Sequence, residues 1–209
     1  SASQPSPPTG VDGLTIPTPT VDADDFVTGV DNRFLPLPIG ARWEYAATGD
    51  RPGTVAVTTF EGPDIAGVAT TAVRTVTTPE TGGRSMTTDF YAQDDDGNVW
   101  WFGRQGEWEA GSGGAQAGLA MAAAPRQGDG YRQAFRSGVV DRRAQVLAVD
   151  AQVTVPAGDY DDLVQVSTSS PATDVVTHAW YAAGVGLVAL ETVEGGPETQ
   201  LGLVAHDEP

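Results

Sequence analysis

The chain has 209 residues, of which 28 are acidic and 11 basic, and its formal net charge is −17. DNA, RNA and anionic membranes bind cationic surfaces, so this charge argues against all three as partners. Cysteine is absent, which excludes disulfide bonds, thiolate metal sites and a cysteine nucleophile. No apolar run approaches the length of a transmembrane helix. We therefore expect a domain that does not span a membrane and does not bind nucleic acid.

The first 25 residues are rich in Pro, Ser, Thr, Gly and Asp. Such a segment buries too little apolar surface to fold, so we predict a disordered tether over 1–25 and a single domain over 26–209. Tethers of this composition typically connect a domain to a secretion signal or a lipid anchor. We expect an extracellular or cell-surface-anchored monomer, and an upstream lipid anchor is left open.

The domain begins with an extended, proline-punctuated segment around 34–38, which we expect to pack on the core. Short β-branched and aromatic runs separated by turn residues then continue to the end of the chain, and no helical period is sustained. The predicted strands cover 42–47, 54–60, 68–78, 107–109, 131–135, 141–150, 152–155, 163–169, 175–181, 186–193 and 200–205. This spacing predicts an all-β, single-domain antiparallel β-barrel or strongly curved sheet.

The strongest turn signal lies in 88–111, which holds three of the five tryptophans. The sequence Asp94–Asn98 contains Asp-Gly between two apolar runs, the pattern typical of a β-hairpin turn. After the turn, Trp100 and Phe102 share one strand face and Val99 and Trp101 share the other. Because both faces are apolar, we expect this hairpin to be covered on both sides.

The strand pattern is interrupted at 111–130, where glycine and alanine dominate. We predict one long loop here, with at most one helical turn, because the glycines break any helical period. Leu119 and Met121 would be its buried anchors. Long loops are often functional, and we expect this one to close an end of the barrel and cover Trp100 or Trp101.

Several segments resemble a group of secreted actinobacterial proteins of unknown function. The matching segments are DNRFLPLPIGARWEY, FYAQDDDGNVWWFG, the run 107–135, VTVPAGDY and WYAAGVGLV. The last two are also similar to periplasmic β-proteins with a curved antiparallel sheet, whose shape resembles that of lipoprotein carriers. The resemblance covers residues 31–204 and implies a fold and a location but no activity. The group has proline where Ala117 stands, so we expect the long loop to differ here.

Calcium is the one cofactor that the sequence leaves open. Asp94, Asp96 and Asn98 place oxygen ligands in one turn, although their spacing does not fit an EF-hand loop. A second acidic turn lies at 159–162. Because aspartate favours turns for its own backbone hydrogen bonds, both are also explained as solvated β-turns. Zinc needs three or four ligands, and the chain has two histidines.

Catalytic chemistry finds little support in the sequence. His178 lies in a predicted strand and His206 near the end of the chain, and no Gly-x-Ser-x-Gly motif accompanies them. Glu107 and Glu109 share a strand face beside Trp108, as a pair of glycosidase carboxylates would. However, such spacing arises readily among 28 acidic residues.

The interpretation we favour is a non-catalytic domain that binds an apolar or carbohydrate ligand, or a partner protein, through its aromatic residues. The candidate ligand-binding residues are Trp100, Trp101, Phe102, Leu119, Met121, Trp180 and Tyr181. One alternative is a hydrolase or isomerase that uses acidic residues in a barrel pocket, and another is a structural surface module without a ligand. A pocket lined by aromatic residues would favour ligand binding. A carboxylate pair at the floor of that pocket would favour the enzyme, and a filled interior would favour the structural module.

Overall fold

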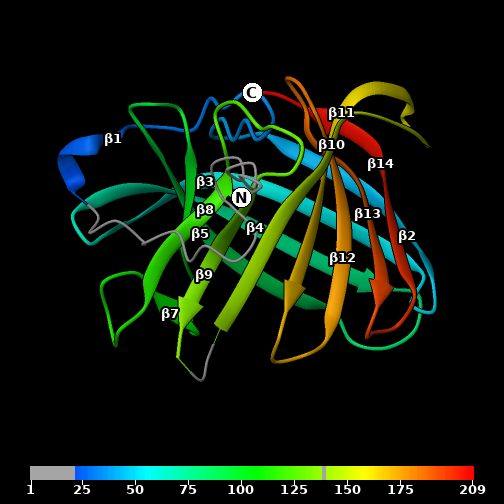
Figure 1. The fold of residues 1–209 in the computed structure, drawn as a ribbon. Helices are drawn as coiled ribbons and strands as arrows, with labels where there is room; N and C mark the ends of the chain where they lie inside the picture. Colours follow the sequence, from blue (N-terminus) through cyan, green and yellow to red (C-terminus); the bar gives the residue numbers. More distant parts are fainter. Residues whose placement is uncertain (1–21, 138–139) are drawn as a thin grey trace, which may run out of the picture.

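The computed structural model describes residues 22–137 and 140–209, which form one antiparallel sheet of 14 strands and a single 3-10 turn (Figure 1). The elements are η1 (Ala23–Asp25), β1 (Phe26–Val27), β2 (Arg42–Gly49), β3 (Gly53–Ile65), β4 (Val68–Pro79), β5 (Ser85–Asp94), β6 (Val99–Arg104), β7 (Trp108–Glu109), β8 (Gln116–Met121), β9 (Gly130–Arg136), β10 (Val140–Val155), β11 (Gly158–Ser170), β12 (Val175–Ala182), β13 (Gly186–Glu194) and β14 (Thr199–Asp207). The predicted all-β class is confirmed.

The sheet closes on itself. Its strand order is β1-β5-β4-β3-β2-β14-β13-β12-β11-β10-β9-β8-β6-β7, and β5 also pairs with β6. That pairing completes a ring in which only the two-residue strands β1 and β7 lie outside the closed circuit. A closed ring removes the exposed strand edges on which other chains could pair. The predicted antiparallel barrel or strongly curved sheet is therefore confirmed.

The prediction of one long loop over 111–130 is wrong, because Gln116–Met121 within it form strand β8. This strand pairs with β6 on one side and β9 on the other, so it completes the ring. Its small residues are required there. A Cβ added to Gly118 would lie 2.0 Å from the backbone carbonyl of Gln133 in β9. The sequence predicted a loop because its glycines interrupt any helical period and glycine and alanine disfavour strands, whereas pairing on both sides decides the structure.

Both faces of the central hairpin β5–β6 are buried, as predicted. On one face, Phe102 packs edge-to-face on Phe26 of β1, with ring centroids 5.2 Å apart. Phe102 and its buried neighbours form what we call the outer cluster: Ile65, Val68, Ala72, Phe90, Ala92, Phe102, Ala110 and Ala117. On the other face, Val99 and Trp101 are also buried. The N-terminal strand and the β3–β4 hairpin thus cover one face, and the interior of the ring covers the other.

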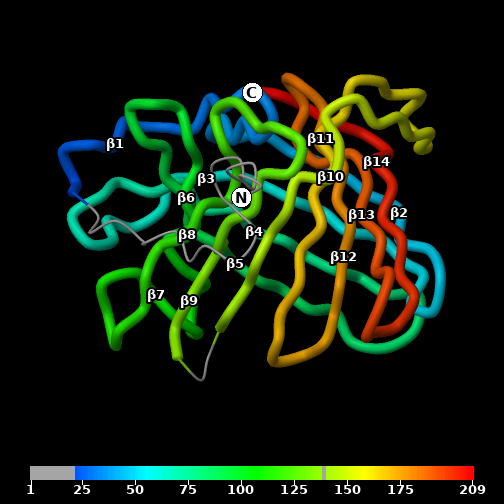
Figure 2. The backbone as a smooth tube through the Cα atoms, in the orientation of Figure 1, coloured from blue at the N-terminus to red at the C-terminus, as the bar shows by residue number. Residues whose placement is uncertain are grey.

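The segment 28–41 closes one end of the ring, running along it from β1 to β2 in blue, opposite the β11–β12 turn (Figure 2). Asn32 holds this segment in place. Its side-chain amide donates to backbone carbonyls of the β5–β6 turn and of the residue after β8, at 2.9 and 3.2 Å, and its Oδ1 accepts from the amides of Phe34 and Leu35. Leu37 is buried in the core beside them. The predicted packing of this extended segment is confirmed, and it provides the end closure expected of 111–130.

Most of the predicted tether, residues 1–21, lies outside the described residues. The next residues form the short turn η1, capped by the Asp22 carboxylate, which accepts from the Asp24 amide at 3.0 Å. Ala23 packs against the outer cluster. No helix within 22–137 or 140–209 is long and apolar enough to cross a membrane.

Candidate functional site

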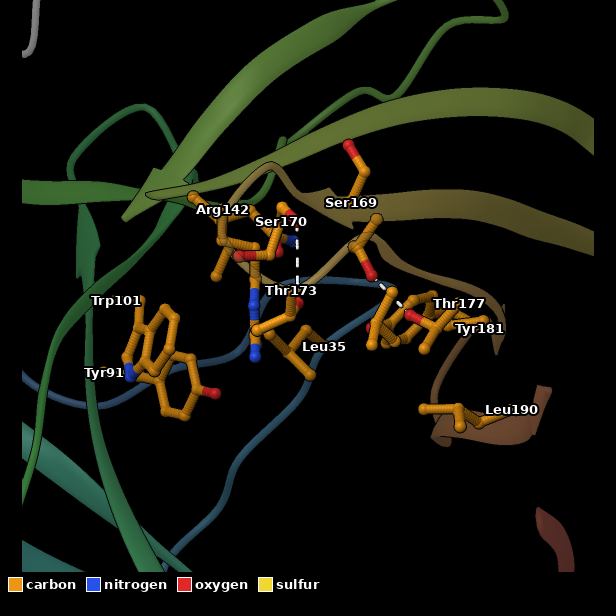
Figure 3. Close-up of a pocket in the computed structure, with 15 residues that line it drawn as sticks. Leu35, Tyr91, Trp101, Arg142, Ser169, Ser170, Thr173, Thr177, Tyr181 and Leu190 are labelled. Atoms are coloured by element: carbon orange, nitrogen blue, oxygen red, sulfur yellow. Dashed lines mark hydrogen bonds between the residues drawn. The ribbon is translucent and has the colours of Figure 1, made fainter. Parts of the chain in front are cut away.

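A cavity of about 420 Å³ lies on the inner side of the ring (Figure 3). Side chains from β5, β6 and β8 to β13 line it, together with Leu35 from the end-closing segment. The lining residues are Leu35, Tyr91, Trp101, Ala120, Gln133, Arg142, Thr168, Ser169, Ser170, Thr173, Val175, Thr177, Ala179, Tyr181 and Leu190. This volume falls within the range of roughly 300–1,000 Å³ that is typical of small-molecule sites.

An aromatic wall is fixed at one side of the cavity. Trp101 donates its indole N–H to the carbonyl of Gly103 at 2.8 Å and to Oδ1 of Asp89 at 3.1 Å. Asp89 in turn accepts from Arg104 in a two-pronged ion pair, with N–O distances of 2.8 and 3.2 Å. Figure 3 shows Tyr91 beside Trp101. Because its indole N–H is satisfied within the protein, the part of Trp101 that borders the cavity is apolar.

The charged residue of the cavity is Arg142 of β10. Its guanidinium lies over the Trp101 ring, 4.9 Å from the centroid. Burial lowers the pKa of Arg142 from its ordinary value, and the charge of Arg104 adds to this effect. An arginine stays protonated under such conditions. The cavity therefore holds a fixed positive charge against an aromatic face.

Hydroxyl groups cluster near the β11–β12 turn. Thr168 and Thr177 face each other across β11 and β12 and share a hydrogen bond, and Thr173 donates to the carbonyl of Ser170 at 3.5 Å. Figure 3 shows Arg142 on the same side as Ser170 and Thr173. Leu35 belongs to the closed end described above. The cavity lining thus has hydroxyl groups near the β11–β12 turn and an apolar side chain, Leu35, from the closing segment.

Two tyrosine hydroxyls of the cavity keep their protons well above neutral pH. Burial raises the pKa of Tyr91, with Asp89 and Tyr181 adding to the effect and Arg142 and Arg104 opposing it. Burial also raises the pKa of Tyr181, which Arg142 opposes. Both hydroxyls therefore stay protonated and are able to donate a hydrogen bond, and both lie within the electrostatic reach of Arg142.

The structure separates the predicted ligand-binding residues into groups. Trp101 and Tyr181 line the cavity. Trp100 and Phe102 belong to the opposite face of the hairpin, where Phe102 is fully buried. The other three lie elsewhere in the core: Leu119 packs with one interior cluster, and Met121 and Trp180 belong to another. Leu119 stands opposite Trp100 in the β6–β8 register, on a strand rather than a lid.

The residues proposed for calcium are engaged by the protein's own donors. The Asp94 carboxylate accepts from the Asn98 amide at 2.8 Å, from the Asn98 side chain at 3.1 Å and from the Trp100 indole at 2.9 Å. Asn98 Oδ1 accepts from the Ala123 amide, and Asp96 is exposed. Across 22–137 and 140–209, His, Asp and Glu side chains form no group of three or more that could hold a metal ion. These contacts give the turn a structural role.

Carboxylates do not converge on the cavity. Glu107 and Glu109 are exposed near the short strand β7, and no Asp or Glu stands among the described lining residues. His178 approaches Gln165 at 3.4 Å and packs edge-to-face with Trp180, whereas His206 stacks on Trp43. The arrangement supplies neither an acid–base pair nor a nucleophile with a base.

Sequence reasoning missed Arg142, and a signal for it exists. Val140, Arg142, Ala144 and Val146 follow the period of two along β10, and the last two are buried. Arg142 thus occupies a position where the alternation predicts an apolar side chain. An arginine in the inward phase of a strand is a candidate binding residue, because burying a charge is costly without a function or a partner.

Two solved structures are similar to this chain. A proposed exported protein with a YmcC-like fold from Bacteroides fragilis shares 12% identity, with a TM-score of 0.49, over 85% of this chain and 100% of its own. A proposed lipoprotein from Parabacteroides distasonis shares 13% identity, with a TM-score of 0.47, over 84% of this chain and 99% of its own. No protein-family model and no curated protein matches the sequence. At this level of similarity neither neighbour bears on function.

Proposed function

We propose that this protein is a non-catalytic, extracellular or cell-surface-anchored β-domain that binds a small ligand with an apolar or aromatic body inside its ring of strands. The observation that carries the proposal is the cavity of about 420 Å³ with Trp101, Tyr91 and Tyr181 in its wall. Most small-molecule sites combine an apolar lining with a few placed polar groups. The tether-like composition of 1–25 and the resemblance to secreted proteins support the location.

The two alternatives receive less support. A hydrolase or isomerase working with acidic residues needs carboxylates at the cavity, and the described lining has none. A purely structural module needs a filled interior, because a void forfeits packing contacts and costs stability. Retaining this cavity in a folded domain favours binding over a structural role.

A neutral dye tests the proposal. N-phenyl-1-naphthylamine emits more strongly in apolar surroundings, and we expect it to bind the purified protein with saturable affinity. Ala179 is buried in the cavity wall, so Ala179→Leu narrows the space and should weaken the dye affinity at least tenfold. Ala183 is exposed, and Ala183→Leu is the matched control that leaves affinity unchanged.

A second filling variant, Ala120→Leu, narrows the cavity from β8 on the opposite wall. Circular dichroism establishes that each variant keeps its β signal. If both filled proteins remain folded and bind the dye as the parent protein does, the dye binds elsewhere and the proposal is wrong.

A further inference from the structure

Arg142 differs from the arginines around it in having no carboxylate partner among the described residues. The nearby acids are already engaged. Asp89 pairs with Arg104 at 2.8 Å, and Asp141 pairs with Arg132 and Arg143 at 3.7 and 3.3 Å. The protein thus places a guanidinium in its cavity and directs the neighbouring carboxylates to other arginines.

The residues around Arg142 in the cavity indicate how a ligand would lie. Arg142 lies on the same side of the cavity as Ser170 and Thr173 (Figure 3), which contribute hydroxyl and carbonyl groups, and Leu35 adds an apolar side chain from the segment 28–41. Trp101 and Tyr91 line the same cavity as the apolar Leu35 and the charged Arg142. A molecule with a charged head and an apolar body would match the guanidinium and the apolar part of this lining at once.

We propose that the ligand is an amphipathic anion whose carboxylate or sulfonate head group binds Arg142, with its apolar body lying along Trp101 towards Leu35. This inference rests on the proposed function and names the chemical class of its ligand. The planar guanidinium offers parallel N–H donors that match two oxygens of such a head group. The protonated hydroxyls of Tyr91 and Tyr181 are further donors within the same cavity.

The overall charge sharpens the inference. A net charge of −17 repels anions at the protein surface, although salt at about 0.1 M screens charges beyond roughly 10 Å. Retention of an anion therefore depends on local groups inside the cavity, where screening is weaker. Arg142 is the charged residue in the described lining.

Two dyes with one aromatic skeleton test this inference. 1-Anilinonaphthalene-8-sulfonate carries a sulfonate, and N-phenyl-1-naphthylamine is its neutral counterpart. We expect Arg142→Gln to weaken the affinity for the sulfonate dye at least tenfold and the affinity for the neutral dye less than about threefold. Arg142→Lys restores part of the sulfonate affinity, since a single charge replaces the two-pronged contact.

Arg74 provides the matched control, because its guanidinium also lies over an aromatic ring, 4.7 Å from the Phe60 centroid, but is exposed. Arg74→Gln should change neither affinity. If Arg142→Gln leaves sulfonate binding unchanged, or weakens both dyes equally, the anion inference is overturned while cavity binding stands. If neither dye binds the parent protein, the proposed function itself is wrong and the inference falls with it.

Discussion

The two faces of the β5–β6 hairpin are covered by different kinds of side chains. On the outer face, Phe102 is fully buried among apolar side chains and meets Phe26 edge-to-face. On the inner face, Trp101 borders a cavity and lies near the guanidinium groups of both Arg104 and Arg142. Adjacent residues of one strand thus have different surroundings: one face is filled by packed apolar side chains, and the other borders a cavity that holds a charge.

The largest expected effect is on the outer face. Phe102→Ala removes a fully buried ring and should lower the free energy of unfolding by about 3–5 kcal/mol. Leu190→Ala, at a half-buried cavity-lining position, should cost less than about 2 kcal/mol because its side chain already borders a void. Urea denaturation measures both, and equal losses would break the distinction between a packed and an open face.

The two arginines over Trp101 provide the next comparison. Asp89→Asn replaces the carboxylate that pairs with Arg104 by a neutral amide, and should lower the free energy of unfolding by about 1.5–3 kcal/mol. Arg142→Gln removes a half-buried charge that has no carboxylate partner among the described residues, and should change the free energy of unfolding by less than about 0.5 kcal/mol. A large loss of stability in Arg142→Gln would show that Arg142 is a structural residue.

Alkaline pH should lower the free energy of unfolding through the buried tyrosine Tyr91 of the inner face. Burial raises the pKa of Tyr91 in the folded protein, whereas the pKa of a tyrosine in an unfolded chain is about 10. As pH rises above that value, the unfolded chain releases its proton first. The contribution of Tyr91 to the free energy of unfolding is therefore fully present below about pH 10. Above that pH it falls by up to about 1.4 kcal/mol per pH unit for one group.

Denaturation between pH 8 and 11 tests this slope. Tyr91→Phe should flatten it, since that variant has no proton to release at this position. An unchanged slope in the variant would mean that other groups, such as the buried Tyr45 and Tyr131, account for the whole dependence.

Calcium should have the smallest effect on stability of all these changes. The Asp94 carboxylate is occupied by three donors from Asn98 and Trp100, so excess calcium and excess chelator should give the same Tm. A Tm that rises with calcium and loses this response in Asp96→Ala would instead establish a metal site at the turn.

Much of the fold follows from local sequence. The Asp-Gly turn, the β-branched runs and the apolar residues on both faces of 99–102 predict strands, a hairpin and two covered faces, all of which the structure has. Closure of the ring does not follow from them. The pairing of β2 with β14 joins strands from opposite ends of the chain, and strand β8 depends on partners on both sides.

The site was only partly predictable for a related reason. Trp101 and Tyr181 were expected as ligand-binding residues and line the cavity, because aromatic side chains are visible in the sequence. Which strand face turns inward is decided by the ring as a whole, so Trp100 and Phe102 could not be distinguished from Trp101. The importance of Arg142 depends on neighbouring carboxylates pairing elsewhere, which only the assembled sheet shows.

Binding of an amphipathic anion in the cavity is tested by a crystal structure of the protein grown with 8-bromooctanoate, whose bromine is located by its anomalous signal. We expect a bromine peak in the cavity towards Leu35 and carboxylate density within hydrogen-bond distance of the Arg142 guanidinium. Density for the ligand on the outer surface, with none between Trp101 and Tyr181, would contradict it.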